Sequence, residues 1–368
     1  VYCQQLFSLP PILPLQVRRM HALEKSNFTL GPFVHSDPQG KATASNINVA
    51  ILKEIESGRY SCAARPLRIN SLGDEFKASG FMQGSIDVHG SHELFYWTRS
   101  RGQGLIVSSE TAVVVVHYSP DMGRIVLLRP AGSVDAIIAL IGEASAAIAV
   151  SCDSVDIVVR YCGTELVSAL SKAGWKPLSR PLLPSAYADD ETWPEVLIKS
   201  SPVVCPHGAD GRPVRAAIAR HQDRYEYRSE RSLLDCGELD FILGGSSRSH
   251  ISDGFENDFN SAVVSFIEEG EYRDLRFHYL FRESAIIGFG VTGRTTHVAH
   301  SYYTGVVKEA RLSAYFLWQI YLTEAKEGAS ALNMGGSETK SLHIYKSQTF
   351  GDHSIRFTKV LEFPATSR

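Results

Sequence analysis

Two kinds of hydrophobic pattern follow each other along the chain, and together they predict alternating strands and helices. From about residue 93 the runs LFYW, GLIVSS, TAVVVVHYS and RIVLLRP are short, rich in β-branched and aromatic residues, and bounded by Gly, Ser or Pro, which predicts strands. Asp135–Ala149 predicts a helix, VDIVVRY a strand, TELVSALSKAG a helix that ends at Gly174, and EVLIKSS a further strand. We therefore expect one mixed α/β domain over residues 76–200.

The first 75 residues have a different character, because Pro, Asn, Ser and basic residues are mixed through them. A regular period occurs at Ala44–Ser57, where Ile47, Ile51 and Ile55 recur near the helical repeat. We expect residues 1–75 to form an N-terminal arm or cap that carries this one short helix.

The second half repeats the order of the first half. The basic segment 212–231 and Phe255–Glu269 predict helices, and RFHYLFR, SAIIGFGVTG and THVAHSYYTG predict three strands joined by tight turns. An amphipathic helix over Arg311–Glu327 then ends at Gly328, and a strand in ALNMGG, a polar turn and a last strand, IRFTKVLEF, complete the chain. Residues 201–368 are thus predicted to form a second α/β domain.

The composition is that of an ordinary globular protein. The chain has 368 residues, of which 44% are hydrophobic and 21% charged, so it can bury a full core, and about 150 residues per domain suggests two domains. A net charge of −3 argues against wrapping nucleic acid over the whole surface but permits a local basic groove. The N-terminal apolar run is short, broken by prolines and followed by its positive charges, so we expect no signal peptide. No uninterrupted apolar run approaches the ~18 residues of a membrane span.

The cysteines and histidines predict no metal site. No CxxC pair occurs, so a zinc cluster of the usual spacing is not expected. His297 and His300 are three residues apart on a predicted strand, so they point to opposite faces and cannot hold one ion together. Few cysteines in a long chain are typical of a reducing compartment, which predicts a cytoplasmic location. The six are Cys3, Cys62, Cys152, Cys162, Cys205 and Cys236.

The motifs of several common enzymes are missing. The sequence has no GxSxG motif and no convincing Ser-His-Asp arrangement. Arg99–Gly104 has the letters of an acyl-CoA pyrophosphate loop, but it precedes a predicted strand, whereas such a loop must open a helix to bind phosphate. In the second half GVVKEARLSAY has no glycine after Gly305. Acyl-CoA binding is therefore disfavoured in both halves.

The C-terminal part carries the most specific pattern. A helix runs into Gly328, a strand leads to Gly335-Gly336, and the aromatic-lysine pair Tyr345-Lys346 precedes Phe350-Gly351. This order is similar to the C-terminal signature of the Fem-type peptidyltransferases. The first half, closed by DDETWPEVLI, resembles the first of the tandem GNAT domains in the same group, which includes the catalytic region of the lysyl-phosphatidylglycerol synthases.

The resemblance implies an α/β fold of two tandem GNAT-like domains and an aminoacyl-tRNA-dependent acyltransferase. Such enzymes move an aminoacyl group from charged tRNA onto an amine, with aminoacyl-tRNA as co-substrate and no further cofactor. The long polar helix of the cell-wall enzymes and the membrane-spanning half of the lipid enzymes do not occur in this sequence. We therefore expect a small soluble amine as acceptor, in specialised, antibiotic-like natural product biosynthesis. Two alternatives stay open: an acyl-CoA-dependent GNAT N-acyltransferase and a non-catalytic binding protein with a degenerate GNAT pair.

Lys346 is the strongest candidate catalytic residue. The resemblance implies that this lysine faces the reacting ester or a nearby tRNA phosphate, where a fixed ammonium would offset the charge that develops on the carbonyl oxygen. The alternative is a surface lysine on a hairpin. Gly335 and Gly336 either allow close backbone approach to a ligand, because glycine lacks a Cβ, or form a plain turn. We assign both glycines and Tyr345 to substrate binding.

Two further residue groups are candidates. Tyr302 and Tyr303 end a predicted strand where the related enzymes carry aromatic residues that line the acceptor cleft, so we assign Tyr303 a catalytic role and Tyr302 a substrate-binding role; the alternative is a pair of half-buried strand aromatics. Arginines recur at spacings of four, four and three between residues 220 and 231, which on a helix places them on one face suited to phosphates. The alternative is a solvated face neutralised by nearby acidic residues. The predicted tRNA-binding residues are Arg215, Arg220, Arg224 and Arg228.

Overall fold

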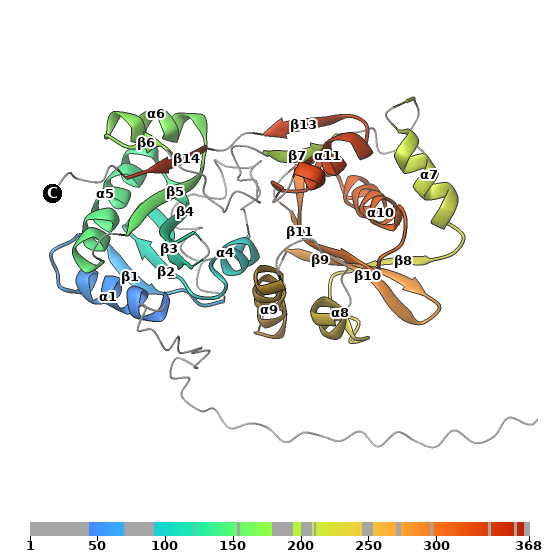
Figure 1. Cartoon of the computed structure of the whole chain (residues 1–368), viewed down its shortest axis with the longest axis horizontal. Helices are drawn as coiled ribbons and strands as arrows, with labels where there is room; N and C mark the ends of the chain where they lie inside the picture. The colour runs from blue at the N-terminus through green and yellow to red at the C-terminus, as the bar shows by residue number, and fades with distance from the viewer. Residues whose placement is uncertain are drawn as a thin grey trace, which may run out of the picture. The chain divides into compact units, whose positions relative to one another are not determined.

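The computed structural model has the predicted mixed α/β architecture, with one sheet built mainly from each half of the chain (Figure 1). The described part belongs to one compact unit, Ala42–Arg368. Predictions made for the segment before residue 44, including the missing signal peptide, lie outside the described residues. The described residues are 44–69, 92–120, 122–152, 155–178, 194–199, 208–209, 211–244, 253–269, 274–294, 297–337, 340–356 and 359–363.

The first sheet has seven strands in the order β1-β2-β3-β4-β5-β14-β6. Strands β2, β3 and β4 pair antiparallel, whereas β4 and β5 run parallel. The valine-rich runs predicted these strands because a strand buried on both faces reads as a continuous apolar run. The bounds are β1 Ala63–Pro66, β2 Leu105–Ser108, β3 Ala112–Ser119, β4 Arg124–Gly132, β5 Asp156–Cys162, β6 Lys176–Pro177 and β14 Lys359–Glu362.

The second sheet has seven strands in the order β13-β7-β12-β11-β10-β9-β8. Strands β8 to β11 form an antiparallel meander, and β11 and β12 run parallel. The bounds are β7 Glu195–Ile198, β8 Glu226–Glu230, β9 Leu275–Arg282, β10 Ala285–Arg294, β11 Val298–Val306, β12 Ala331–Asn333 and β13 His353–Arg356.

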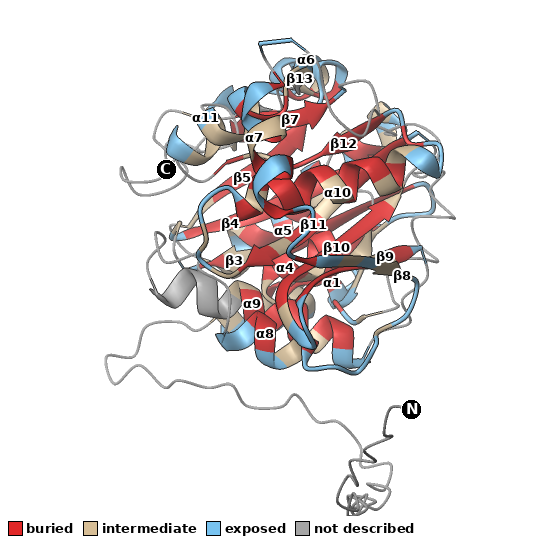
Figure 2. Cartoon of the chain, turned by 90° about the vertical axis from the view of Figure 1, so that its right-hand side faces the viewer, coloured by how far each residue is buried: buried red, intermediate tan, exposed pale blue. Residues whose placement is uncertain are grey.

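The helices cover the sheets and join the cores. Helices α1, α5 and α6 pack on the first sheet, and α7 and α10 pack on the second, where α10 is largely buried (Figure 2). Helices α4, α8 and α9 contribute to a core that reaches both sheets. The bounds are α1 Ala44–Glu56, α4 Glu93–Ser100, α5 Val134–Ser151, α6 Thr164–Lys172, α7 Arg212–His221, α8 Glu238–Gly244, α9 Asp253–Glu269, α10 Leu312–Lys326 and α11 Lys340–Thr349.

Each sheet takes a strand from the other half of the chain, which the predicted boundaries at residues 75 and 200 do not allow for. Strand β7, from the end of the predicted first domain, lies between β12 and β13 in the second sheet. Strand β14, near the C-terminus, lies between β5 and β6 in the first sheet. Helix α1 and strand β1, from the predicted arm, belong to the first sheet and its core. The predicted single strand IRFTKVLEF is therefore two strands in two sheets.

The run LFYW is helical, so its prediction as a strand was wrong. It lies in α4, where the side chain of the N-cap His92 accepts a hydrogen bond from the Leu94 amide at 3.1 Å. The helix ends at Arg101, whose φ of 55° is left-handed. Leu94, Phe95 and Tyr96 are all buried. Because a helix buried on several sides has no clear amphipathic period, a short apolar run cannot be told from a strand.

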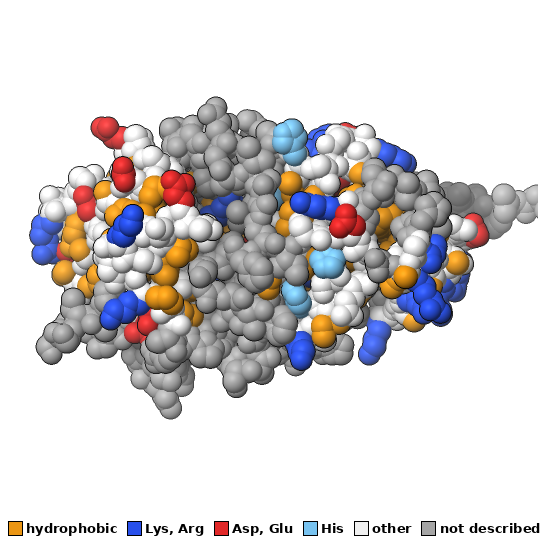
Figure 3. All heavy atoms as spheres, turned by 90° about the horizontal axis from the view of Figure 1, so that it is seen from above, with side chains coloured by type: hydrophobic (Ala, Val, Ile, Leu, Met, Phe, Trp, Pro, Cys, Tyr) orange, Lys and Arg blue, Asp and Glu red, His pale blue; other side chains and the backbone are white. Residues whose placement is uncertain are grey.

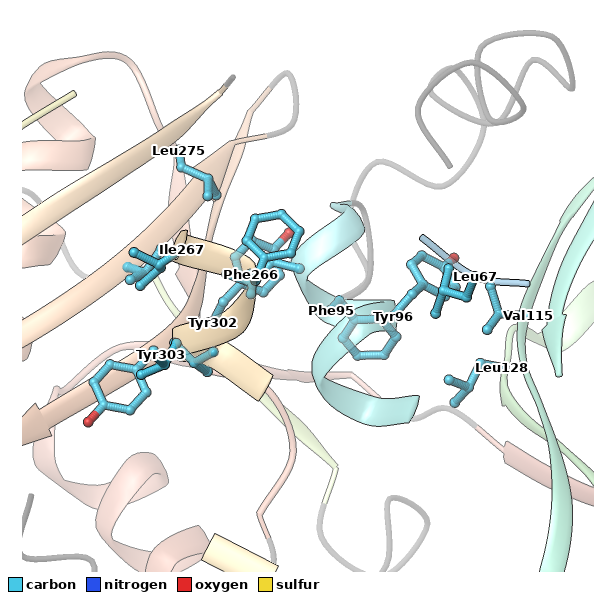
Figure 4. Packing of buried hydrophobic residues seen from close by; sticks show 14 of the residues in the cluster. Leu67, Phe95, Tyr96, Val115, Leu128, Phe266, Ile267, Leu275, Tyr302 and Tyr303 are labelled. Atoms are coloured by element: carbon cyan, nitrogen blue, oxygen red, sulfur yellow. The ribbon is translucent and has the colours of Figure 1, made fainter. Parts of the chain in front are cut away.

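One hydrophobic core runs from the inner face of the first sheet through α4 and α9 to the second sheet. Val115 and Leu128 lie on one side, Phe95 on α4 and Phe266 on α9 lie between, and Tyr303 lies on the other side (Figure 4). A hydrogen bond of 3.0 Å from the Trp97 indole to the Ser265 hydroxyl also joins α4 to α9. The two sheets therefore share one core rather than two separate cores.

Helix α5 is the described helix that is long and apolar enough, by length and composition alone, to cross a membrane. It has 18 residues and a mean hydropathy of 1.8. Its buried side chains, such as Leu140, Ile141 and Ile148, pack in one cluster with Val114 and Leu127 of the first sheet. This is the position of a core helix in a globular domain.

Candidate functional site

The second sheet opens where its two parallel strands separate. Strands β11 and β12 pair from Val298 with Ala331 to His300 with Asn333. Beyond that point β12 ends, whereas β11 continues to Val306 and pairs with β10 alone among the described strands. Ligands of open α/β sheets bind beyond the carboxyl ends of parallel strands at such a divergence. We call this place the β11/β12 opening.

A β-bulge lies on β11 at this opening. Val291 faces Tyr303 and Thr292 faces Ser301, so Tyr302 is an extra residue without a partner position on β10. Such a residue leaves the regular ladder and bends its strand. The bulge also explains why Tyr302 and Tyr303, although consecutive, both join the same core cluster (Figure 4).

The two predicted tyrosines have different surroundings. The Tyr302 ring lies 5.7 Å from the His92 ring of α4 and close over Gly293, where an added Cβ would approach the ring to 2.7 Å. The Tyr303 ring is buried among core residues, 6.2 Å from the Phe289 ring. Tyr302 thus lies where the strands separate, while Tyr303 has the packing of a core aromatic, and its catalytic role stays a prediction.

The loop after β12 is fixed by backbone and side-chain contacts. The Gly335 amide donates to Asn333 Oδ1 at 2.8 Å, and the Met334 amide donates to the Val196 carbonyl at 2.9 Å. Gly335 has a φ of +69°, a conformation that glycine adopts without strain. Asn333 also donates through Nδ2 to Glu195 at 2.8 Å, and both side chains are buried. Gly335 is therefore required by this turn.

Lys346 lies on helix α11, so the polar turn predicted for this segment was wrong, and the alternative of a surface lysine on a hairpin does not hold either. Its ammonium donates hydrogen bonds to the carbonyl oxygens of Met334 at 2.8 Å, Gly335 at 3.4 Å and Gly336 at 2.5 Å. The sequence therefore placed the lysine and the glycine pair together correctly. The structure shows Lys346 tying α11 to the loop that borders the β11/β12 opening.

Tyr345, the neighbour of Lys346, faces the core. Its ring packs against the second-sheet cluster and lies 5.9 Å from the Phe350 ring. Burial raises the pKa of the Tyr345 phenol, so this group keeps its proton at neutral pH. Phe350, in the last part of the sequence signature, thus packs against Tyr345 of α11.

The arginines do not share one helix face, so the helix predicted over 212–231 was too long. Helix α7 ends at His221, and β8 begins at Glu226. The alternation in YEYRSE is a strand pattern that the four-residue arginine spacing obscured. Lys and Arg side chains gather toward the right-hand end of Figure 3, where Figure 1 places α7 and β8.

The four predicted arginines differ in their partners. Arg220 is exposed on α7, and Arg215 donates to the Gly208 carbonyl at 2.6 Å. Arg224 lies 3.4 Å from Glu309, and Arg228 lies 2.6 Å from Glu226. Acidic neighbours thus partly neutralise Arg224 and Arg228. This agrees with the alternative interpretation, a solvated face whose charge is neutralised by nearby acidic residues.

A buried polar network next to the bulge was missed by the sequence analysis. His278 Nε2 contacts Thr292 Oγ1 at 2.8 Å, and Thr292 donates to Glu324 at 2.7 Å. The Tyr227 hydroxyl lies 2.7 Å from His278 Nδ1. The Arg276 guanidinium lies 3.6 Å from the Glu324 carboxylate. No sequence signal connects these residues, because they come from β8, β9, β10 and α10.

Burial sets the protonation state of His278, whereas hydrogen bonds and neighbouring charges set that of Glu324. It lowers the pKa of His278, although the hydrogen bond and charge of Glu324 act in the opposite direction. Burial alone would raise the pKa of Glu324, but hydrogen bonds from His278 and Thr292 and the charge of Arg276 outweigh it, so that pKa is lowered. We therefore assign a neutral His278 and an ionised Glu324 at neutral pH. Within the described residues, no group of three His, Cys, Asp or Glu side chains could hold a metal ion.

Comparisons with known proteins identify the fold. No family model matches the sequence, and the curated proteins contain no match. The chain is similar to a conserved protein of unknown function from Bacteroides thetaiotaomicron, with a TM-score of 0.57 and 11% identity over 81% of this chain and 98% of that one. It is also similar to the C-terminal domain of a putative lysylphosphatidylglycerol synthetase from Agrobacterium fabrum, with a TM-score of 0.52 and 12% identity over 79% and 92% of the two chains. The chain is similar to FemX as well, with a TM-score of 0.51 and 11% identity over 81% of this chain and 96% of that one.

The structural neighbours are the Fem-like and lysylphosphatidylglycerol synthetase proteins that the sequence pattern suggested. The predicted fold class, α/β with two GNAT-like halves, is confirmed. At these identities the similarity concerns the fold, and the site must be argued from its own residues.

Proposed function

We propose that the protein is an acyltransferase that moves an aminoacyl group from charged tRNA to the amine of a small acceptor. The observation that carries this proposal is the β11/β12 opening, bordered by the bulge at Tyr302 and by the loop that Lys346 ties down. The acyltransferase fold shared with FemX and the synthetase domain supports it.

The reaction needs no nucleophile from the protein. The acceptor nitrogen attacks the ester carbonyl carbon, and the carbonyl oxygen takes the negative charge. When this intermediate collapses, the ester C–O bond breaks, the ribose oxygen of tRNA leaves, and the proton from the amine ends on that oxygen. The enzyme must hold both substrates in place and stabilise the oxyanion. The bulge at Tyr302 bends β11 at this opening, next to the place where both substrates must be held.

The region before α10 disfavours acyl-CoA as the donor. In this segment Glu309 accepts hydrogen bonds from Tyr225 at 2.7 Å and from Arg282 at 2.7 Å. The hydrogen bond from Tyr225, with the charges of His221 and the neighbouring arginines, lowers the pKa of Glu309. Glu309 lies three residues before the first residue of α10, so it places a negative charge, partly offset by Arg224 and Arg282, near the helix N-terminus that would bind a pyrophosphate.

The proposed function predicts amine-dependent deacylation of charged tRNA. Bulk tRNA charged in turn with each radiolabelled amino acid should lose its label to a small amine when the protein is present. Acetyl-CoA should neither replace the donor nor give heat in a calorimetric titration. Micromolar acetyl-CoA binding, without any use of charged tRNA, would favour the acyl-CoA-dependent alternative.

We also propose that α7 contacts tRNA phosphates. Arg220→Ala should make the slope of log K against log salt less steep by about 0.7–0.9, the change expected for one lost phosphate contact, and equally for every tRNA. Arg59→Ala is the matched control, because it removes the same charge from an exposed arginine near α1, where Glu54 pairs with it. Equal slopes for wild type and Arg220→Ala would show that α7 is a solvated face.

A cytoplasmic location and a role in specialised metabolism remain proposals. Charged tRNA occurs in the cytoplasm, and a long chain with few cysteines is typical of a reducing compartment. The place in natural product biosynthesis rests on the expected small acceptor.

A further inference from the structure

Strand β10 packs directly against helix α10 through two glycines. A Cβ added at Gly288 would lie 3.5 Å from the Phe316 ring, and one added at Gly290 would lie 3.0 Å from Ile320. From the first contact to the second, the helix advances four residues, about 6 Å, and the strand two residues, about 6–7 Å, so the contacts recur at matching intervals along both elements. The missing side chains therefore let α10 approach the backbone of β10 closely.

Thr292, two residues further along β10, continues this row of contacts with hydrogen bonds. Its hydroxyl donates to the Glu324 carboxylate of α10 at 2.7 Å, four residues after Ile320. Since that hydroxyl has only one proton, the 2.8 Å contact with His278 Nε2 is a hydrogen bond that His278 donates. The Tyr227 hydroxyl then donates to the other ring nitrogen, His278 Nδ1, at 2.7 Å. Thr292 is thus held from α10 and from β9 together.

These hydrogen bonds meet at the bulge of the β11/β12 opening. The register between β10 and β11 shifts between Val291 and Thr292, so Thr292 is the first residue after the shift. A slip of β10 along β11 would transfer the bulge from Tyr302 to another residue, because strand residues alternate between the two faces. The fixed position of Thr292 therefore determines that Tyr302 is the residue that bulges.

Gly293 contacts the same tyrosine from the other face of β10. Because successive strand residues point to opposite faces, Gly293 faces away from α10. A Cβ added there would lie 2.7 Å from the Tyr302 ring, closer than real Cβ atoms approach. The φ of Gly293 lies outside the left-handed region that favours glycine. The space taken by the Tyr302 ring, and not the backbone conformation, therefore requires a glycine at this position.

We propose that Thr292 and Gly293 are positioning residues that act through Tyr302, the aromatic residue of the β11/β12 opening. Thr292 fixes the register of β10, and with it the bulge, while Gly293 leaves room for the ring. Neither residue touches a substrate. The contact of the ring with the acceptor rests on the proposed function, whereas the fixed position of the ring rests on the second sheet alone.

Fluorine NMR of the full chain labelled with 3-fluorotyrosine follows the Tyr302 ring without any substrate. The signal that disappears in Tyr302→Phe belongs to this ring. Gly293→Ala should shift the signal, because the ring must move by about 0.7 Å, from 2.7 Å to an ordinary contact of about 3.4 Å from the new Cβ. Thr292→Val should shift or split it, whereas Thr292→Ser, which keeps the hydroxyl, should leave it close to that of the wild type.

Thr323→Val is the matched control for Thr292→Val. It removes the same kind of hydroxyl from α10, next to Glu324 in the sequence, where Thr323 lies 3.0 Å from the Tyr227 hydroxyl and makes no contact with β10 through that hydroxyl. This variant should keep the Tyr302 signal unchanged. Thermal melting of each variant verifies folding.

Transfer from charged tRNA shows whether the position of the ring matters for the reaction. Gly293→Ala should lower the single-turnover rate about tenfold and raise the KM for the amine, since a misplacement of about 1 Å costs up to about 10²-fold. The KM for charged tRNA should stay unchanged. A partly unfolded sample would instead lower the rate and leave both KM values unchanged. In Tyr302→Leu, which lacks the ring, the Gly293→Ala substitution should have no further effect, because both changes act through one contact.

An unchanged Tyr302 signal in folded Gly293→Ala or Thr292→Val protein would overturn the proposal, and so would an equal change of the signal in Thr323→Val. If Gly293→Ala alone does not fold, its combination with Tyr302→Leu decides the question. Recovery of folding in the double variant supports the contact, and failure to fold where Tyr302→Leu alone folds overturns it.

The transfer assay separates the positioning from the proposed function. Unaltered transfer kinetics in a Gly293→Ala protein with a shifted Tyr302 signal would overturn the role of the ring position in the reaction. The expected NMR changes in a protein whose wild type transfers nothing from charged tRNA would support the fixed position of Tyr302 while removing the proposed function.

Discussion

Replacement of Lys346 by alanine should lower the rate of aminoacyl transfer about 10²-fold, because a shift of about 1 Å in the loop at the β11/β12 opening would misplace the substrates. The carbonyl oxygens of Met334, Gly335 and Gly336 would lose their shared donor, and the loop at the β11/β12 opening would lose its link to α11. Lys346→Arg should recover part of the rate, because a planar fork cannot converge on three carbonyls as an ammonium does. Single-turnover transfer from charged tRNA measures the effect.

The matched control is Lys340→Ala, at the exposed first residue of the same helix, which should leave the rate unchanged. Thermal melting shows whether a lower transfer rate is caused by unfolding of the variant. A well-folded Lys346→Ala protein with near-normal turnover would remove Lys346 from the mechanism and show that the loop needs no tie to α11.

Replacement of Glu324 by glutamine should lower the free energy of unfolding by about 3–5 kcal/mol, because removing one member of a buried ion pair leaves its partner uncompensated. The Glu324 side chain is 4% exposed and lies 3.6 Å from Arg276 and 3.5 Å from Arg294. Glu327→Gln is the control: Glu327 also contacts Arg276, at 3.1 Å, but is 43% exposed and should contribute less than about 1 kcal/mol. Urea denaturation of both variants gives the comparison.

Because of the same network, the free energy of unfolding should decrease as the pH falls. His278 has a lowered pKa, so its contribution is present above the unfolded value of about 6.5 and declines as the unfolded chain binds the proton. Glu324 also has a lowered pKa, so its contribution is present above about 4.3 and is lost as the pH falls through the folded value. The stability difference between wild type and Glu324→Gln should therefore shrink below about pH 4.3. A difference that stays constant down to pH 3 would show that the charge of Glu324 is not what stabilises the fold.

The sequence predicted the elements whose pattern is local. Strands such as β3 and β10 are long apolar runs, and α10 has clear limits at Arg311 and Gly328. The sequence failed where local patterns conflict. Helix α4 is too short and too buried to show a period, and α11 is too polar to show an apolar face, so the glycine pair before it suggested a turn.

The candidate site was predictable in part for the same reason. Lys346 and Gly335 lie within twelve residues of each other, so a motif could bring them together. Glu195 and Asn333 meet across 138 residues, because β7 and β12 are neighbours in the second sheet. Such contacts depend on the sheet order, which no local pattern in one sequence reveals.

The exchange of β7 and β14 also limits the order in which the two halves can fold during translation. Strand β14 pairs with β5 from Lys359 opposite Cys162, so the first sheet is completed only after residue 362 has been synthesised. During translation the edge of β5 therefore stays open until residues 359–362 leave the ribosome, although domains generally fold as they emerge. A chain truncated before residue 359 loses a strand from its first sheet, and a chain that begins after residue 200 loses β7 from its second. Neither half of this chain is a transferable module, so gene fusion or domain recombination must move both halves together.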